Sequence, residues 1–199
     1  MQVTAERLSP VLQMEAIEAA RRVVAVGATP REQGRALGEI AKDKIRELYD
    51  IKLAQYRGSL ERWDEIVAGA RPLMQRLTPH TYDELLGQAE GAGMAEHALL
   101  RLATEYEISM ELRANVSGDK CTGLLSHRLL QRPGVQVIGQ NNDENPDVWA
   151  DGRLDIIVEH RQPTDADHTG APIDCVLYTH PGIPAYMGIN GEGLGVTWL

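Results

Sequence analysis

The sequence has 199 residues, 43% of them apolar, which is enough to bury the core of one domain. Its formal net charge of −9 is spread along the chain and argues against nucleic acid as a partner, because binding phosphates takes a concentrated basic face. No apolar run approaches the roughly 18 residues needed to span a membrane, and the N-terminus lacks a basic-then-apolar secretion signal. With two cysteines in such a chain, we expect reduced thiols and a cytoplasmic location.

The first elements are expected to be a short amphipathic helix over residues 5–20 and a buried strand over residues 23–26. A helix capped by Ser59 follows later, and Pro72 is expected to kink or restart it. Thr78 then stands before a proline in the pattern of a helix cap. The N-terminal half is therefore predicted to be mostly helical.

The longest predicted helix begins after Thr29, which is followed by Pro30 at the first helical position and by Glu32 to complete a capping box. Gly34 and Gly38 lie one turn apart on this helix and cost about 1 kcal/mol each relative to alanine. We therefore expect a close backbone contact with a neighbouring element there. The apolar stripe of the helix holds a 3.6-residue period for about seven turns. It consists of Leu37, Ile40, Ala41, Ile45, Leu48, Leu53 and Tyr56.

The character of the chain changes near residues 118–125. Before that point, Gly91 and Gly93 permit a left-handed helix stop, a further helix is expected over residues 95–109, and residues 110–117 look extended. After it, short β-type runs are separated by turn residues. These runs are residues 135–139, 154–160, 173–178, 186–190 and 194–199. The last two resemble a hairpin, so we expect helices first and then a mostly antiparallel sheet.

No metal site is predicted. The six histidines are scattered, and none stands four residues from another. The acidic run that begins at Asp143 fails as a calcium loop, because Val148 and Leu154 occupy positions that require glycine and glutamate. Cys175 lies inside an apolar run and is predicted to be a core residue.

Three stretches form an informative combination: Lys120-Cys121-Thr122, the run Gly-Gln-Asn-Asn-Asp at 139–143, and the glycine-rich run at 188–196. Each alone is weak, since asparagine or aspartate beside glycine is usually turn chemistry. In this order and spacing they resemble the acyl-coenzyme A:6-aminopenicillanic acid acyltransferase family, also called isopenicillin N acyltransferases. That family belongs to the N-terminal-nucleophile (Ntn) hydrolases. Residues 29–38, 85–93 and Pro181-Gly182 resemble other parts of the same family.

The resemblance implies a four-layer αββα sandwich and a division at Cys121. Residues 1–120 would be a helical pro-segment, and residues 121–199 would begin the nucleophile-bearing subunit of the same domain. Cys121 would attack the carbonyl of Lys120 and so free its own α-amine. The family usually has glycine where Lys120 stands.

The residues allow the following chemistry. A cysteine at a new N-terminus carries its own base, because the reference pKa values of a thiol and an α-amine are close. Cys121 would attack an amide or thioester carbonyl, and the resemblance puts Asp143 beside its amine. Asn190 is the candidate oxyanion donor, and Thr122 and Asn141 are candidate substrate contacts. No cofactor is expected, although acyl-coenzyme A is a possible substrate.

The predicted function is a self-processing cysteine amidohydrolase or acyltransferase acting on small acyl compounds. Two alternatives stay open. One is a choloylglycine-type hydrolase of N-acyl amino-acid conjugates. The other, favoured by Lys120, is an uncleaved, non-catalytic relative with a binding or structural role. Because residues 194–199 read as a strand entering an apolar layer, we also expect the fold to be completed by further chain beyond Leu199 or by a second chain.

Overall fold

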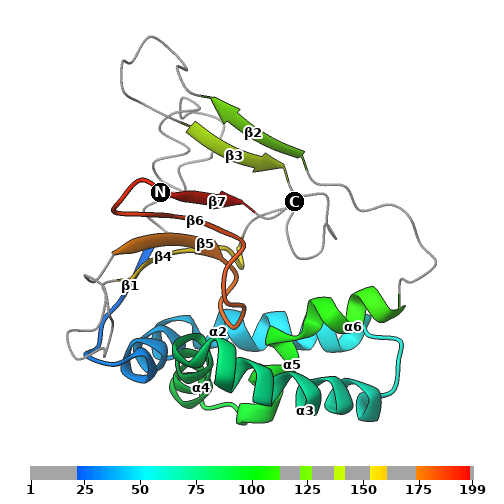
Figure 1. The fold of residues 1–199 in the computed structure, drawn as a ribbon. Helices are drawn as coiled ribbons and strands as arrows, with labels where there is room; N and C mark the ends of the chain where they lie inside the picture. Colours follow the sequence, from blue (N-terminus) through cyan, green and yellow to red (C-terminus); the bar gives the residue numbers. More distant parts are fainter. Residues whose placement is uncertain (1–21, 113–121, 127–136, 142–152, 161–173, 198–199) are drawn as a thin grey trace, which may run out of the picture.

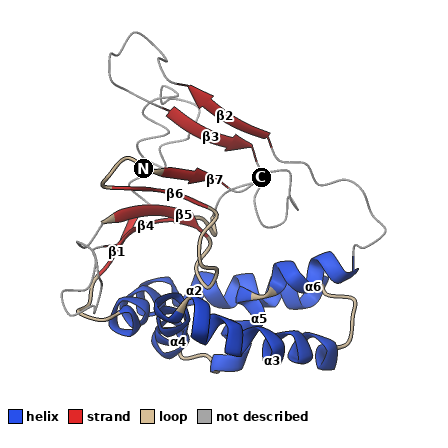
Figure 2. Ribbon diagram, in the orientation of Figure 1, coloured by secondary structure: helices blue, strands red, loops and turns tan. Residues whose placement is uncertain are grey.

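A computed structural model describes residues 22–112, 122–126, 137–141, 153–160 and 174–197. The helix predicted over residues 5–20 lies outside these ranges. Within them the protein has a layer of helices and a layer of strands. In Figures 1 and 2 the helices lie below the strands. The expectation of a mixed helix-and-strand fold, with the helices before most of the strands, is confirmed.

The helical layer precedes residue 113. Its members are α2 (Pro30–Gln55), α3 (Leu60–Leu77), α4 (Pro79–Ala92), α5 (Glu96–Ala103) and α6 (Glu105–Leu112). The strands are β1 (Arg22–Ala25), β2 (Thr122–Ser126), β3 (Val137–Asn141), β4 (Ile156–His160), β5 (Cys175–Thr179), β6 (Met187–Asn190) and β7 (Gly195–Thr197).

Five of the strands form one sheet in the order β1-β4-β5-β6-β7. Strand β1 pairs with β4 in parallel, and the remaining pairs of this sheet are antiparallel. Strands β2 and β3 form a separate antiparallel pair. The mostly antiparallel sheet predicted from the sequence is therefore present, with β1 as the parallel exception.

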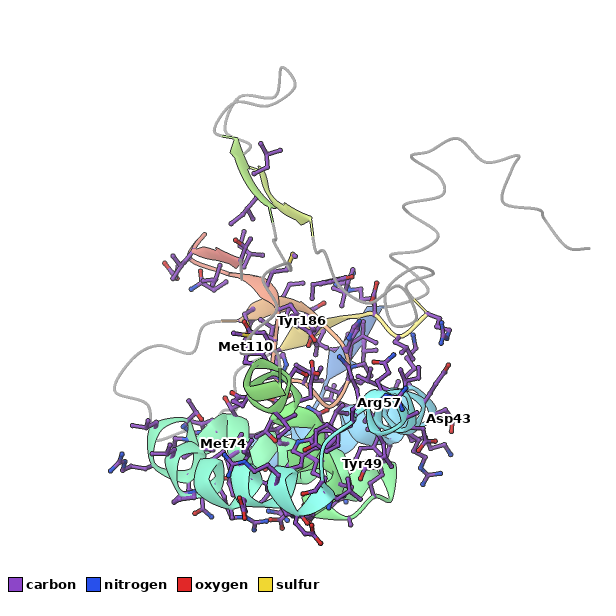
Figure 3. All side chains as sticks on the ribbon, turned by 90° about the vertical axis from the view of Figure 1, so that its right-hand side faces the viewer. Asp43, Tyr49, Arg57, Met74, Met110 and Tyr186 are labelled. Carbon is purple, nitrogen blue, oxygen red and sulfur yellow. The ribbon has the colours of Figure 1, made fainter. Side chains whose placement is uncertain are left out.

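The two faces of the sheet differ in burial. Three of the side chains that face the helices, Ala25, Ile156 and Val158, are almost fully buried. On the other face, Val176 and Ile189 are register partners and are 40% and 48% exposed. Side chains fill the space between the helices and the sheet (Figure 3), so the described core lies between these two layers.

Helices α2 and α4 touch backbone to backbone. A Cβ on Gly34 would lie 2.0 Å from the carbonyl oxygen of Glu84, and one on Gly87 would lie 2.1 Å from that of Arg31. No real side chain tolerates such distances, so the contact requires glycine on both helices. Its members are Gly34 and Gly38 on α2 and Gly87 and Gly91 on α4. The close contact expected at the α2 glycines is therefore confirmed, and α4 is the partner.

Local signals set most helix ends. Thr29 and Glu32 form the predicted capping box of α2, and Ser59 accepts the N–H of Arg62 to cap α3. Gly93 ends α4 with a φ of 62°, in the left-handed region. Thr78 is the N-cap residue of α4 and Pro79 is its first helical residue, as predicted. The Thr78 side chain makes no capping hydrogen bond, and its hydroxyl donates to the carbonyl of Met74 in the preceding helix.

Pro72 lies inside the continuous helix α3 and does not restart it, so only the expected kink remains a prediction. Two other predictions about the helices were wrong. Ile40, assigned to the buried stripe of α2, is 63% exposed. The helix expected over residues 95–109 is two helices that meet at Thr104, and residues 110–112, expected to be extended, belong to the second. At this junction Thr104 accepts a hydrogen bond from the buried Trp63 indole at 3.3 Å.

Candidate functional site

Strands β2 and β3 bring two of the three motif stretches together. Their register pairs Thr122 with Asn141, so the start of β2 and the end of β3 lie at the same end of the ladder. In the sequence, Cys121 directly precedes Thr122, and Asp143 follows Asn141 by two residues. The predicted site residues Lys120, Cys121 and Asp143 lie outside the described residues. For Thr122 and Asn141 the backbone pairing is described, but the side chains are not.

The third motif stretch forms the hairpin of β6 and β7, as predicted. This hairpin lies beside β3. A Cβ placed on Gly195 of β7 would be 3.5 Å from the side chain of Ile138 on β3. Strands β3 and β7 point in the same direction (Figure 1). Asn141 is three residues beyond Ile138, about 10 Å further along the strand, and so lies toward Thr197 at the far end of β7. This end is the opposite one from the β6–β7 turn.

Asn190 lies at the β6–β7 turn. Its side-chain oxygen accepts the backbone N–H groups of Glu192 at 3.1 Å and Leu194 at 2.8 Å, and these hydrogen bonds shape the turn. The described residues therefore do not bring Asn190 to the end of β3 where Thr122 and Asn141 pair. Its proposed role as an oxyanion donor for Cys121 stays a prediction.

The cross-strand neighbour of Asn190 is Cys175, and the neighbour of Cys175 on the next strand is His160. Residues opposite one another in an antiparallel pair point to the same face, which here is the face of Val158 toward the helices. His160 Nε2 lies 3.5 Å from a carboxylate oxygen of Glu84 on α4. Three polar side chains of the sheet, together with Glu84 of α4, thus lie at one end of this face.

Contacts between helices hold Glu84 at this place. Its backbone carbonyl is the atom that approaches Gly34 of α2. One turn further along α4, the buried Gln88 donates to Glu84 at 3.4 Å and accepts the N–H of Gly182 at 2.9 Å. A chain of polar contacts therefore runs from the β5–β6 loop through α4 to β4.

Burial sets the protonation of this cluster. It raises the pKa of Glu84 to about 7, although the hydrogen bond from Gln88 acts in the opposite direction. It lowers the pKa of His160. It also raises the pKa of the Cys175 thiol, as do the nearby charges of Glu84 and Asp174. Near neutral pH the thiol is therefore protonated and the imidazole is uncharged.

Cys175 itself is only partly buried and does not belong to the closed core. The prediction that it is a core residue is therefore met in part: it faces the helices, but its neighbours are polar.

A second polar group lies at the other end of β4 and β5. Asp155 is 2.9 Å from Nε2 of the fully buried His180 and accepts the hydroxyl of Tyr178 at 2.7 Å. Lys44 of α2 donates to the backbone oxygen of Asp155 at 3.3 Å, and the ring of Tyr186 packs edge-on against His180. These contacts fix the start of β4 and the β5–β6 loop against α2.

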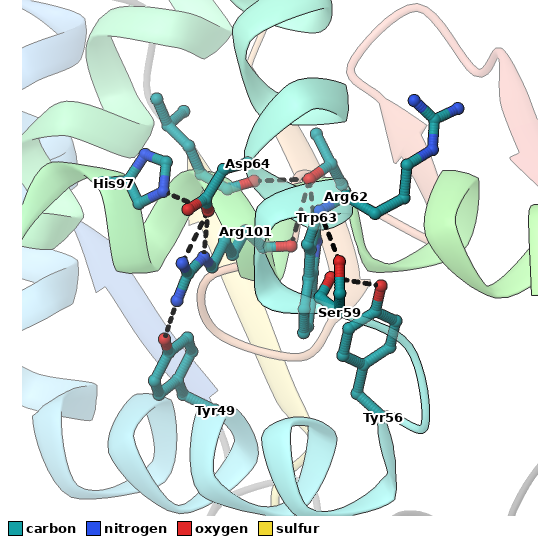
Figure 4. Close-up of polar contacts among 10 residues, drawn as sticks. Tyr49, Tyr56, Ser59, Arg62, Trp63, Asp64, His97 and Arg101 are labelled. Atoms are coloured by element: carbon teal, nitrogen blue, oxygen red, sulfur yellow. Dashed lines mark hydrogen bonds and ion pairs between the residues drawn. The ribbon is translucent and has the colours of Figure 1, made fainter.

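A third polar group connects the helices at some distance from the sheet (Figure 4). Asp64 of α3 is 2.5 Å from His97 and accepts from Arg101 at 2.7 Å, and Arg101 reaches Tyr49 of α2 at 3.2 Å. The hydrogen bonds of His97 and then of Arg101 hold the pKa of Asp64 below its usual range. Because the carboxylate is 40% exposed, solvent screens these contacts, and we assign them to helix packing.

Among the described residues there is no group of three or more potential metal ligands from histidine, cysteine, aspartate and glutamate. Likewise, no helix in the described part of the chain is long and apolar enough to cross a membrane.

No protein-family model matches this sequence, and no curated protein is significantly similar to it. The cluster of Glu84, His160 and Cys175 was not predicted from the sequence, because residues 84, 160 and 175 meet only after the sheet has formed and α4 has packed on it. The available signal was weak: two polar side chains, His160 and Cys175, at the ends of apolar strands.

Proposed function

We propose that the protein is a self-processing N-terminal-cysteine amidohydrolase or acyltransferase with Cys121 as its nucleophile. The observation that carries the proposal is the pairing of Thr122 with Asn141. This register joins the strand that follows Cys121 to the strand that precedes Asp143. Two sequence stretches that the family resemblance assigns to one active site are therefore neighbours at one end of a β-ladder.

The proposed reaction has two stages. First, Cys121 Sγ attacks the carbonyl of Lys120, and the peptide bond breaks to leave a thioester and a free α-amine on Cys121. Water then hydrolyses the thioester, which releases residues 1–120 as a carboxylic acid and restores the Cys121 thiol. The thiol of Cys121 then attacks a small amide or thioester while that α-amine takes the thiol proton. Asp143 is the group proposed to orient the amine and stabilise its charged form. The acyl group finally passes to water or to an acceptor amine.

The order of the elements supports the same proposal. Among the described residues, the helices lie before residue 113, and the strands other than β1 come after residue 121. The αββα sandwich, with residues 1–120 as pro-segment and residues 121–199 as the start of the nucleophile-bearing part, is the finer form of the proposal. Its second sheet would cover the exposed face at Val176 and Ile189, supplied by further chain or by a second chain.

A second candidate function is an uncleaved relative that binds a ligand without catalysis, and Lys120 in place of the usual glycine favours it. A choloylglycine-type hydrolase would use the same nucleophile on N-acyl amino-acid conjugates. Self-cleavage would distinguish either enzyme from the uncleaved binding protein. Hydrolysis of N-acyl amino-acid conjugates would then distinguish the choloylglycine-type hydrolase from the leading proposal.

The test is the intact mass of the purified chain after incubation at neutral pH. The proposal expects two fragments whose masses place the break between Lys120 and Cys121. Cys121→Ala should remain one chain, and Cys121→Ser, which keeps a weaker nucleophile, should cleave more slowly. A wild-type chain that stays intact and shows no thiol-dependent turnover would exclude the enzyme.

A further inference from the structure

The second cysteine of the chain lies in a setting suited to nucleophilic chemistry. Cys175 stands directly opposite His160 on β4 and directly opposite Asn190 on β6. All three lie on one face of the sheet, and α4 brings the carboxylate of Glu84 to 3.5 Å from His160 Nε2. A thiol, an imidazole and a carboxylate therefore follow one another across this end of the sheet.

These residues match the three roles of a nucleophilic triad. A nucleophile needs a neighbouring base, and the base needs a third group that orients it. Side chains directly opposite in an antiparallel pair have Cβ atoms about 5 Å apart, which puts the thiol of Cys175 within reach of the His160 ring. Glu84 contacts that ring through Nε2, so the other ring nitrogen remains for the thiol.

We propose that Cys175, His160 and Glu84 form a second nucleophilic site, separate from Cys121, at which the thiol is acylated by small activated esters or thioesters. Cys175 is the nucleophile, His160 is the base, and Glu84 is a positioning residue. Asn190 is the neighbouring amide whose –NH2 group can donate to an oxyanion, because its side-chain oxygen already accepts two backbone N–H groups of the turn.

The step balances without any further reagent. The Cys175 sulfur forms a bond to the carbonyl carbon while its proton passes to a His160 ring nitrogen. The tetrahedral adduct then collapses, the bond from the carbonyl carbon to the leaving oxygen or sulfur breaks, and the leaving group takes the proton from His160. The product is an acyl thioester on Cys175, which water can later hydrolyse.

The protonation of the cluster suits this order of events. Burial lowers the pKa of His160, which keeps its ring neutral and able to accept a proton at neutral pH. The raised pKa of the thiol means that Cys175 does not rest as a thiolate. Its reactivity must therefore depend on the base, and this dependence separates the proposed site from an ordinary surface cysteine.

Cys175 is only partly buried, and its neighbour Asp174 is exposed. The side chains of His160 and Glu84 are 12% and 21% exposed. The histidine and glutamate are therefore largely shielded from water. The proposal requires an acyl donor small enough to reach the sulfur from the exposed part of Cys175.

The experiment uses the full chain with Cys121→Ala, which leaves Cys175 as the single thiol. The probe is p-nitrophenyl acetate at pH 7.5, with release of p-nitrophenol giving the rate and peptide mass mapping giving the acetylated residue. We expect one acetyl group on Cys175 and a rate at least about tenfold above that of the same chain in urea. His160→Gln in this background should remove the enhancement, since a general base contributes on the order of 100-fold or more.

Glu84→Gln is a second test that does not depend on the folding of His160→Gln. Glutamine keeps the size of the Glu84 side chain, so we expect this variant to fold. It should lower the rate and flatten the pH–rate profile while the circular dichroism spectrum stays native. If the folded Cys121→Ala chain reacts no faster than the chain in urea, the proposal is wrong. It is equally wrong if the native-like His160→Gln chain reacts at the undiminished rate. Neither result bears on cleavage at Cys121, so the two proposals fail separately.

Discussion

Replacing Glu84 by glutamine should stabilise the protein at pH 8 and change its stability little at pH 4. Burial between α4 and the sheet raises the pKa of this carboxyl from 4.5 to about 7. Below pH 4.5 the group is protonated in both the folded and the unfolded state. Between pH 4.5 and 7 the unfolded chain loses the proton first, so the folded state is progressively destabilised as the pH rises.

The magnitude follows from the difference between the two pKa values. A difference of about 2.5 units corresponds to roughly 3 kcal/mol at about 1.4 kcal/mol per unit. Glutamine has no charge to bury and removes this cost. For a protein of this length, 3 kcal/mol corresponds to roughly 10 °C in the melting temperature.

The assay is thermal unfolding by circular dichroism from pH 4 to pH 8, read as the melting temperature of the variant minus that of the wild type. Taking this difference removes most of the opposite effect of His160, whose lowered pKa destabilises the fold as the pH falls below about 6.5. Glu90→Gln is the matched control on α4. Arg31 lowers the pKa of the exposed Glu90 carboxyl, so this variant should gain nothing at pH 8. A Glu84→Gln difference that is the same at every pH would refute the reasoning.

Other predictions follow from the same structure. Gly87→Ala should cost about 3 kcal/mol or more in urea unfolding, because its Cβ would meet the Arg31 carbonyl at 2.1 Å. Gly69→Ala, whose Cβ would have no atom within 4 Å, should instead stabilise α3 by about 0.5–1 kcal/mol; equal effects of the two would contradict the proposed helix contact. Asn190→Ala should cost about 0.5–1.5 kcal/mol of stability, because two exposed turn N–H groups would exchange their side-chain acceptor for water. If self-cleavage is measured and stays normal in that variant, Asn190 serves the turn and not Cys121. Asp143→Asn should reduce thiol-dependent turnover by about tenfold with a shift of a few degrees in melting temperature, and a large loss of stability at normal turnover would make Asp143 a structural residue.

What could be predicted from the sequence was mostly local. The capping box at Thr29 and the stop at Gly93 depend on neighbours within a few residues, and both are present. At Thr78 the predicted helix start is present as well, but the side chain donates to the carbonyl of Met74 in the preceding helix and makes no capping hydrogen bond. Ile40 has the right spacing for the buried stripe, but its position on α2 faces away from α4 and the sheet.

Contacts between distant segments could be predicted only in kind. The glycines of α2 indicated a close neighbour, yet nothing in the sequence identified α4 as that neighbour. For the site, the order of the motifs indicated that Cys121 and Asp143 belong together, and the pairing of Thr122 with Asn141 agrees with this. Asn190 was grouped with them by sequence motif alone, whereas strand register determines its neighbours and makes Cys175 the adjacent residue.

The parallel pairing of β1 with β4 has a consequence for any cut between residues 120 and 121. Strand β1 precedes that bond in the sequence and β4 follows it, and the two are in register from Arg22 with Ile157 to Ala25 with His160. The N-terminal fragment would therefore contribute an edge strand to the sheet of the C-terminal fragment. Ile156 and Val158 of the second fragment are also buried in the same core as the α2 and α4 helices of the first. A cleaved protein should thus migrate as one species in gel filtration and separate into two only in denaturant, and the first fragment would act as a permanent subunit after the bond is broken.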